Sequence, residues 1–166
     1  SSMDQPAEVS VLEQGPLFVK VAVKGKIGKY SFTQTIRLTQ GEPRIDMSVK
    51  LDWIGSPRIG EPGIEFRADN PRKSFYDDRY KLLVYLPIQI ANQQIYKDAP
   101  FDVCESRLEN TFFNRWDSIK HNIILNWVDV ASKDNSCGLS LFTDHTTSYA
   151  HGKDFPLALN CLLYTS

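Results

Sequence analysis

The amino-acid sequence predicts an all-β protein in which two antiparallel sheets pack face to face as a sandwich. Apolar residues recur with a period of two along several segments, and Gly, Pro, Asp and Asn bound these segments, as is typical of strands. No segment sustains an apolar period of 3.6 residues over three turns, so long amphipathic helices are not expected. A length of 166 residues with 42% hydrophobic residues suits one domain with a sizeable core.

The first third of the chain predicts a three-stranded meander. Residues 1–3 read as an expression scar, and residues 4–166 are expected to form a single domain. In residues 17–24 apolar side chains alternate with lysines, and the glycines of 25–28 allow a tight reversal into a second alternating run at 30–38. After a turn at 40–43, a third run is expected to direct five apolar side chains inward: Ile45, Met47, Val49, Leu51 and Trp53.

The rest of the chain predicts shorter strands separated by loops. Residues 55–79, rich in Pro, Gly and charge, are expected to form a long loop. Residues 80–87 predict a strand, and because 82–86 are apolar without alternation, a sheet covered on both faces is favoured. Short strands are expected at 94–96 and 101–104, weak helical character at 109–121, and strands at 123–131, 137–143 and 156–164. Between the last two lies a polar loop, 144–154.

The charge and cysteine content limit the classes of function that the chain can have. The chain has 19 Lys and Arg against 20 Asp and Glu and a pI near 6.3, so it offers no broad attraction for nucleic acid or anionic membrane. Its apolar runs are too short to span a bilayer. Cys104, Cys137 and Cys161 are an odd count without CxxC spacing and are expected to be buried free thiols. One disulfide between two of them stays open, so cysteine usage does not fix the compartment.

The polar loop at 144–154 is the candidate binding segment. Six of its hydrogen-bonding side chains are the candidate site residues: Asp144, His145, Tyr149, His151, Lys153 and Asp154. A loop at the end of strands can direct such groups at a ligand while the sheet holds it in place, although many loops are only solvated connections. Because the two histidines have neither HxH nor HxxxH spacing, surface hydrogen bonding is favoured over a metal site.

Other catalytic patterns are weak. Asp77 and Asp78 are sequence neighbours, which usually point apart, whereas a glycosidase needs two carboxyl groups about 5 to 9.5 Å apart. No nucleophile elbow and no Gly-rich phosphate loop follows a strand. Among the tryptophans that could stack on a sugar, Trp53 and Trp127 fall in strand patterns and are expected in the core. Trp116 is then the candidate for an exposed face.

A resemblance to a known family makes these predictions more specific. Residues 138–157, GLSLFTDHTTSYAHGKDFPL, resemble a signature stretch in the C-terminal β region of α-mannosidases of glycoside hydrolase family 38. Further pieces resemble the family in the same order: 11–17, 34–38, 43–46, 49–53, 82–87, Tyr96, Pro100, Phe101, Glu105, Arg107 and 127–129. The chain departs from the family pattern at Lys97, Asp102, Ser106 and 161–166, which leaves subgroup and linkage specificity open.

The resemblance implies a supersandwich, galactose mutarotase-like fold belonging to a retaining, zinc-dependent, exo-acting α-mannosidase. In such enzymes the zinc ligands and the nucleophile lie in an N-terminal α/β domain. The resemblance therefore implies that this chain is an excised C-terminal fragment that has no catalytic residue, binds no metal and is inactive alone. Its implied partners are that catalytic domain and α-mannoside glycans, with no nucleic acid or membrane.

The resemblance also gives the 144–154 loop a place at the edge of the sugar site. Tyr149, His151 and Lys153 are the residues expected to reach substrate or to brace the domain interface. The alternative hypothesis is a stand-alone carbohydrate-binding or adhesion module of β-sandwich type, which would bind sugar without a partner. A broad apolar patch on the chain would favour the fragment hypothesis, because excision bares a face that packs on another domain.

Overall fold

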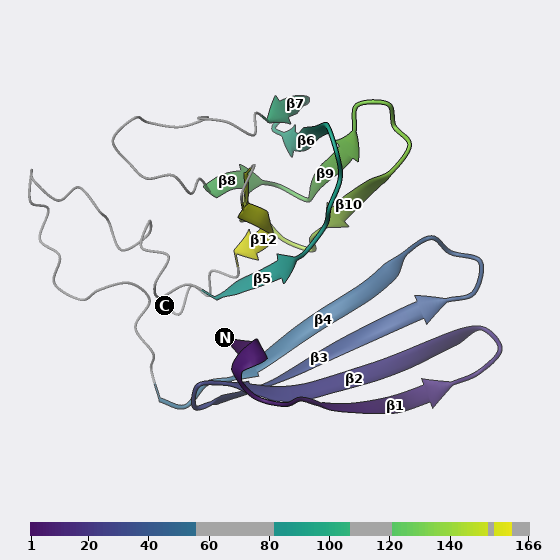
Figure 1. Ribbon diagram of the computed structural model, residues 1–166, viewed down its shortest axis with the longest axis vertical. Helices are drawn as coiled ribbons and strands as arrows, with labels where there is room; N and C mark the ends of the chain where they lie inside the picture. The colour runs from purple at the N-terminus through teal and green to yellow at the C-terminus, as the bar shows by residue number, and fades with distance from the viewer. Residues whose placement is uncertain (56–81, 107–120, 153–154, 161–166) are drawn as a thin grey trace, which may run out of the picture. The chain divides into compact units, whose positions relative to one another are not determined.

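A computed structural model describes residues 1–55, 82–106, 121–152 and 155–160. The chain divides into two compact units, Ser1–Pro57 and Arg58–Ser166, which are described separately. The described residues form three four-stranded antiparallel sheets, and their one short helical turn is the 3-10 helix η1 (Ser2–Asp4) (Figure 1). The predicted all-β class is confirmed. That residues 4–166 form a single domain stays a prediction.

The first unit is one sheet with the strand order β1-β2-β3-β4, drawn from purple to blue in Figure 1. Its strands are β1 (Glu8–Gln14), β2 (Phe18–Ile27), β3 (Tyr30–Thr39) and β4 (Ile45–Asp52). The predicted meander is confirmed as β2 to β4, and β1 adds a fourth strand. Gly28 and Gly41 lie in the turns that connect β2 to β3 and β3 to β4, with φ of 60° and 77°, where glycine avoids the Cβ clash of other residues.

The register of this sheet gathers apolar side chains on one face. Val21 pairs with Val11 on β1 and with Ile36 on β3, and Ile36 pairs with Met47 on β4. Much of this face is nevertheless exposed: Val9 66%, Val11 60%, Leu38 45%, Ile45 62%, Met47 40% and Val49 42%. The expectation that Ile45, Met47 and Val49 are buried is therefore wrong, since alternation aligns side chains on a face without supplying a second layer.

Aromatic residues mark two other points of this sheet. Trp53, expected in the core, is half-buried and meets Tyr30 edge to face with 5.1 Å between the ring centroids. The Phe32 ring lies over Gly25, its cross-strand partner, and is 9% exposed. An aromatic ring that covers a strand glycine protects backbone that a missing side chain would leave open.

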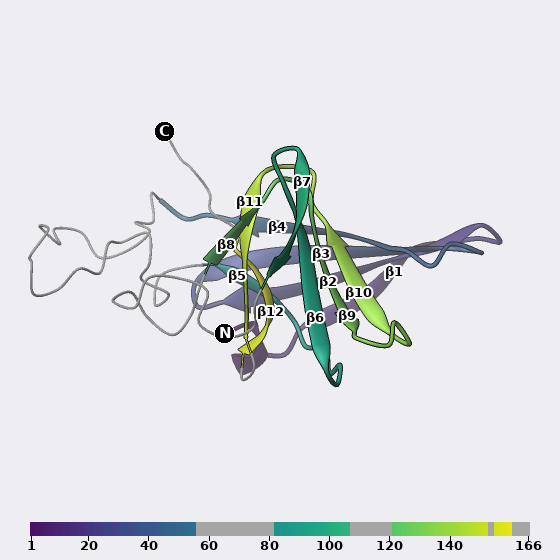
Figure 2. The ribbon, with the colours of Figure 1, turned by 90° about the horizontal axis from the view of Figure 1, so that it is seen from above.

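The second unit is a β-sandwich of two four-stranded sheets, whose strands Figure 2 shows from above. One sheet has the order β10-β9-β6-β7, from β6 (Gln93–Ala99), β7 (Asp102–Ser106), β9 (Trp127–Ser132) and β10 (Gly138–Phe142). The other has the order β5-β12-β11-β8, from β5 (Leu83–Leu86), β8 (His121–Ile124), β11 (Thr147–Gly152) and β12 (Phe155–Asn160). The predicted antiparallel sandwich is confirmed in this unit.

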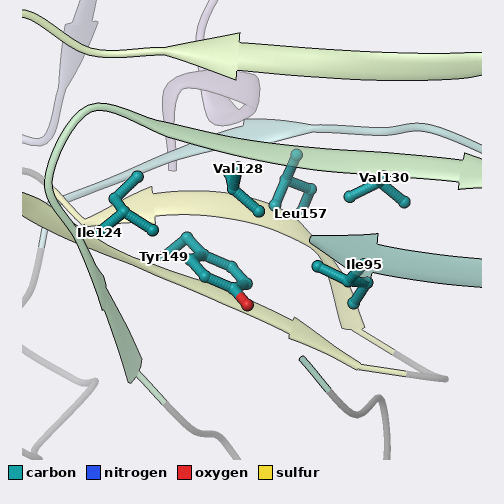
Figure 3. Packing of buried hydrophobic residues seen from close by; sticks show 6 residues of the cluster. All are labelled: Ile95, Ile124, Val128, Val130, Tyr149 and Leu157. Atoms are coloured by element: carbon teal, nitrogen blue, oxygen red, sulfur yellow. The ribbon is translucent and has the colours of Figure 1, made fainter. Parts of the chain in front are cut away.

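The core of the sandwich lies between its two sheets (Figure 3). The first sheet contributes Ile95, Val128 and Val130, and the second contributes Ile124, Tyr149 and Leu157, each no more than 1% exposed. Together these side chains remove a continuous apolar volume from water, which is the main stabilising contribution in a fold of this size.

The strand predicted at 123–131 is two strands in different sheets. β8 ends at Ile124 and β9 begins at Trp127, with a bend at Leu125 and Asn126. The backbone N–H groups of these two residues donate to the Asp98 carboxylate instead of to a neighbouring strand. Because the buried carboxylate accepts hydrogen bonds from two backbone N–H groups, strand pairing stops at these residues. The chain therefore passes from one sheet to the other within a single apolar run.

The predicted loop at 144–154 is largely a strand. β11 spans Thr147–Gly152 between β12 and β8, and Ser148, Tyr149 and Ala150 are buried. Its backbone groups are satisfied by pairing on both sides, because Ser148 pairs with both Asn160 and Ile123. Small and hydrogen-bonding side chains therefore do not exclude a central strand once the ladder supplies the backbone partners.

Four further expectations differ from the structure or fall outside the described ranges. In its sheet β5 pairs with β12 alone, and Tyr85 is 50% exposed, so this strand is not covered on both faces. Cys137 is exposed and Cys104 half-buried, both as free thiols, so Cys137 is not the buried residue predicted; Cys161 lies outside the described residues. Almost all of the predicted loop at 55–79 and the predicted helical stretch at 109–121 also lie outside them, and His121 begins β8.

Within the described ranges, none of the helical residues belongs to a segment long and apolar enough to cross a membrane.

Candidate functional site

Asp144 and His145 form an exposed polar turn after β10. Their side chains are 96% and 66% exposed, and His145 Nδ1 lies 2.5 Å from Asp144 Oδ1. The hydrogen bond with the His145 side chain and electrostatic attraction to it lower the pKa of Asp144, so the carboxylate is charged at neutral pH. This turn presents an acceptor and an imidazole to solvent, the types of group that bind hydroxyls.

A buried carboxylate lies behind this turn. Asp98 accepts hydrogen bonds from Leu125 N at 2.9 Å, from Asn126 N at 2.6 Å and from Asn126 Nδ2 at 3.2 Å, and its side chain is 9% exposed. Burial acts to raise the pKa of Asp98, but the hydrogen bonds from Leu125, Asn126 and Trp127 together outweigh it, so the pKa is lowered. The ionised form is thereby fixed in place at neutral pH.

Thr143 connects Asn126 to the turn. Its backbone N–H donates to Asn126 O at 2.6 Å, and its Oγ1 lies 3.2 Å from the same oxygen and 2.9 Å from His145 O. We call Asp98, Asn126 and Thr143 the anchor network. Since a buried charge holds Asn126 and Asn126 holds Thr143, the exposed turn is tied to the end of the sandwich instead of moving as a free loop.

Tyr149 lies in the core, with its ring between the two sheets (Figure 3). Its hydroxyl meets Ser106 Oγ on β7 at 2.7 Å, which joins the second sheet to the edge strand of the first. Burial raises the pKa of Tyr149 to about 12, although the bond to Ser106 acts to lower it. In this structure its hydroxyl faces protein, and a role in substrate or interface contact stays a prediction.

His151 and the last two predicted residues are separate from the turn. His151 is half-buried near the end of β11, and its Nε2 lies 2.7 Å from Gln93 Oε1 on β6, another link between the sheets. Lys153 and Asp154 lie outside the described residues. Of the six predicted residues, therefore, the described structure brings Asp144 and His145 together and places Tyr149 and His151 farther along, in β11.

The anchor residues were not predicted. Asp98 follows Lys97 and precedes Ala99, and nothing in its spacing indicates that it meets residues 125 and 126. The one available signal is Asn126, a polar turn-forming residue inside a largely apolar run, which marks a position where a strand can bend.

The described residues do not fit a zinc site. Within the described ranges, no group of three or more His, Cys, Asp or Glu side chains is placed to hold a metal ion. A zinc site needs three or four such ligands in tetrahedral geometry.

Trp127 is not in the core, contrary to the prediction from its strand pattern. Val128, the next residue along β9, points into the sandwich, so Trp127 lies on the opposite, outer face of the sheet and is half-buried. Its cross-strand partner is Phe142, which is 71% exposed. Trp116 lies outside the described residues.

Comparison with known families gives one finding. The family described as "Glycosyl hydrolases family 38 C-terminal domain" matches residues 1–160. No curated protein and no solved structure matches the chain.

Proposed function

The chain belongs to the glycosyl hydrolases family 38 C-terminal domain family, and on this premise we propose that it is the C-terminal β domain of a retaining, zinc-dependent exo-α-mannosidase. The whole enzyme would hydrolyse terminal α-mannosides. In this proposal the N-terminal catalytic domain of the same protein supplies the zinc ligands and the nucleophile, and this chain packs on that domain and completes the edge of the sugar site.

The observation that carries the packing role is the exposed apolar face of the β1–β4 sheet. Val9, Val11, Ile45, Met47 and Val49 lie on one face and are 40% to 66% exposed. Contiguous exposed apolar surface on a folded domain usually marks an interface, because it is costly to leave in water. A sheet with one apolar face is suited to pack against a second layer, as in any sandwich.

The Asp144–His145 turn supports the second role, a contribution to the sugar site. A terminal mannosyl unit presents several hydroxyls, and a carboxylate beside an imidazole can accept from and donate to them. The anchor network adds rigidity, which binding groups need if they are to bind without losing entropy. The turn would position substrate or brace the interface and would take no part in bond breaking.

Hydrolysis of a small chromogenic α-mannoside with added zinc tests the proposal. The chain alone is expected to be inactive, and a longer protein that includes the N-terminal region is expected to be active. Activity in the chain alone would contradict the proposal. Absence of activity in both, together with sugar binding by the chain, would favour the stand-alone carbohydrate-binding module.

Replacements in the longer protein separate substrate contact from interface bracing. Asp144→Asn and His145→Gln are expected to raise KM with little change in kcat if the turn holds the ground-state sugar. Asp134→Asn, an exposed aspartate in the turn after β9, is the matched control. Tyr149→Phe, His151→Gln and Lys153→Met test three of the other four predicted residues in the same assay. An unchanged KM in all five site variants would show that the loop does not contact the sugar.

A further inference from the structure

The outer face of the β10-β9-β6-β7 sheet carries aromatic and acidic side chains in register. Val128 and Val130 point into the core, so Trp127 and Asp129 point outward from β9. Asp129 pairs with Ser140 on β10 and with Tyr96 on β6, and Tyr96 pairs with Glu105 on β7. We call the five residues Phe142, Trp127, Tyr96, Asp129 and Glu105 the aromatic–acid face.

The aromatic members form a platform that spans three strands. Phe142 and Trp127 are direct cross-strand partners, and Tyr96 lies on the next strand, one row away. Neighbouring strands are about 4.8 Å apart, so the platform extends roughly 10 Å across the sheet. Phe142 is 71% exposed, and the other two rings are half-buried. Partly exposed aromatic rings can stack on the C–H side of a sugar ring.

The acidic members supply hydrogen-bond acceptors beside these rings. Ser140 Oγ donates to Asp129 Oδ1 at 2.5 Å, which fixes the carboxylate on the face, and Glu105 is exposed. Lys97 on the same strand as Tyr96 does not neutralise them, since its Nζ donates to Ile123 O at 3.1 Å in the other sheet. The face is therefore anionic and accepts hydrogen bonds.

We propose that the aromatic–acid face binds a neutral oligosaccharide. A pyranose ring has apolar C–H surfaces that match aromatic rings and hydroxyl donors that match carboxylates, so it satisfies both kinds of group at once. Nucleic acid would be repelled by Asp129 and Glu105. An apolar protein surface would leave both carboxylates desolvated without partners, which is costly. Sugar is thus the ligand whose charge and surface complement the face.

This site goes beyond the proposed function. It needs neither a catalytic domain nor zinc, and it uses residues other than the Asp144–His145 turn. Phe142 lies two residues before Asp144, so a glycan bound on the face would continue toward that turn. The face would hold sugar units beyond the one that is cleaved.

Binding of soluble α-mannan to the purified chain, followed by affinity electrophoresis and tryptophan fluorescence, tests the proposal. The unmodified chain is expected to bind saturably. Phe142→Ser and Asp129→Asn are each expected to weaken binding at least about tenfold, which corresponds to about 1.4 kcal/mol. Dextran shows whether the face selects mannose or accepts any neutral glycan.

Tyr85→Ser is the matched control, because Tyr85 is also an exposed aromatic residue, 50% exposed, but lies on β5 of the other sheet. It is expected to bind mannan like the unmodified chain, and circular dichroism shows that each variant keeps its fold. No saturable binding of either glycan, or equal binding by Phe142→Ser and the unmodified chain, would overturn the proposal. Protection of the β9 and β10 amides from exchange in the longer protein, without glycan binding, would assign the face to a domain interface instead. Since the assay measures binding alone, absence of mannosidase activity in the longer protein leaves the result interpretable.

Discussion

Apolar residues alternate along strands of both the β1–β4 sheet and the β5–β12 sandwich, but their side chains are buried in the sandwich and largely exposed in the sheet. In the sandwich, Ile124, Val128 and Leu157 are fully buried between two sheets. In the β1–β4 sheet, Val11 and Ile45 share one apolar face and remain 60% and 62% exposed. Alternation decides which face of a strand is apolar, but only a second layer removes that face from water.

The two regions also differ in their polar interactions. The sandwich contains buried hydrogen bonds, with Asp98 at one end and Tyr149 bonded to Ser106 between its sheets. The β1–β4 sheet has exposed ion pairs such as Arg44 with Asp46 at 2.9 Å. Exposed pairs contribute little to stability, whereas a buried group that loses its partner is costly. Substitutions in the sandwich should therefore have larger effects than similar ones in the sheet.

The largest expected effect is Leu157→Ala. Leu157 is 0% exposed in the core, so its truncation leaves a cavity and should lower the free energy of unfolding by about 2–5 kcal/mol. The matched change Val49→Ala, at a side chain 42% exposed, should cost less than about 1 kcal/mol. Urea denaturation, with hydrogen exchange of the β9 and β11 amides, measures both. Equal losses would show that the β1–β4 face is packed as tightly as the core.

Asp98→Ala should have the next largest effect. It leaves the N–H groups of Leu125 and Asn126 without their carboxylate and should cost about 2–4 kcal/mol. Asp52→Ala, which removes an exposed pair with Lys50 at 3.4 Å, should change stability little. Urea midpoints at pH 7 compare the two.

The Asp98 carboxylate should make the free energy of unfolding of the sandwich decrease in acid. Because the pKa of Asp98 is lower in the folded state than its usual value near 3.8, its contribution is fully present above that value. The contribution is lost as the pH falls through the lowered folded pKa. Asp98→Asn, which does not titrate, should therefore flatten the stability profile below about pH 4. A profile identical to that of the unmodified chain would exclude Asp98 as the source.

Gly25→Ala tests the weaker β1–β4 sheet directly. An added Cβ would lie 2.7 Å and 2.8 Å from Cε1 and Cζ of the Phe32 ring, so the ring must move off the strand. We expect a loss of about 1–3 kcal/mol, confined to exchange of the β2 and β3 amides. Gly15→Ala is the control, since nothing lies within 4 Å of its added Cβ. A loss that spreads to the sandwich amides would show that the two units unfold together.

Tyr149→Phe should have the smallest effect, about 0.5–1.5 kcal/mol, because it removes one buried hydrogen bond and keeps the ring. A double-mutant cycle with Ser106→Ala isolates that bond, and a coupling energy near zero would contradict it. Burial raises the pKa of Tyr149 to about 12, above its unfolded value of about 10. The protonated Tyr149 hydroxyl therefore makes its full contribution to the free energy of unfolding below pH 10. This contribution is lost as the pH rises toward 12, which alkaline ultraviolet titration of the unmodified chain and Tyr149→Phe can follow.

The candidate site could be predicted only in part. Asp144 and His145 were identifiable because polar residues follow an apolar strand, and they do form an exposed turn. Tyr149 belonged to the same polar stretch but lies in the core, since its neighbours pair with strands on both sides. Asp98 gave no signal, because its donors are 27 and 28 residues away in the sequence.

The all-β class, the two hairpins that join β2, β3 and β4, and the family to which the chain belongs could be predicted from the amino-acid sequence. These depend on period-two alternation, turn residues and motif order, all of which are local or ordered along the chain. Three features became visible only in the folded chain: β11 is a central strand, residues 123–131 divide between two sheets, and Trp127 faces outward. Burial and hydrogen-bond partners come from residues distant in sequence, which no local pattern specifies.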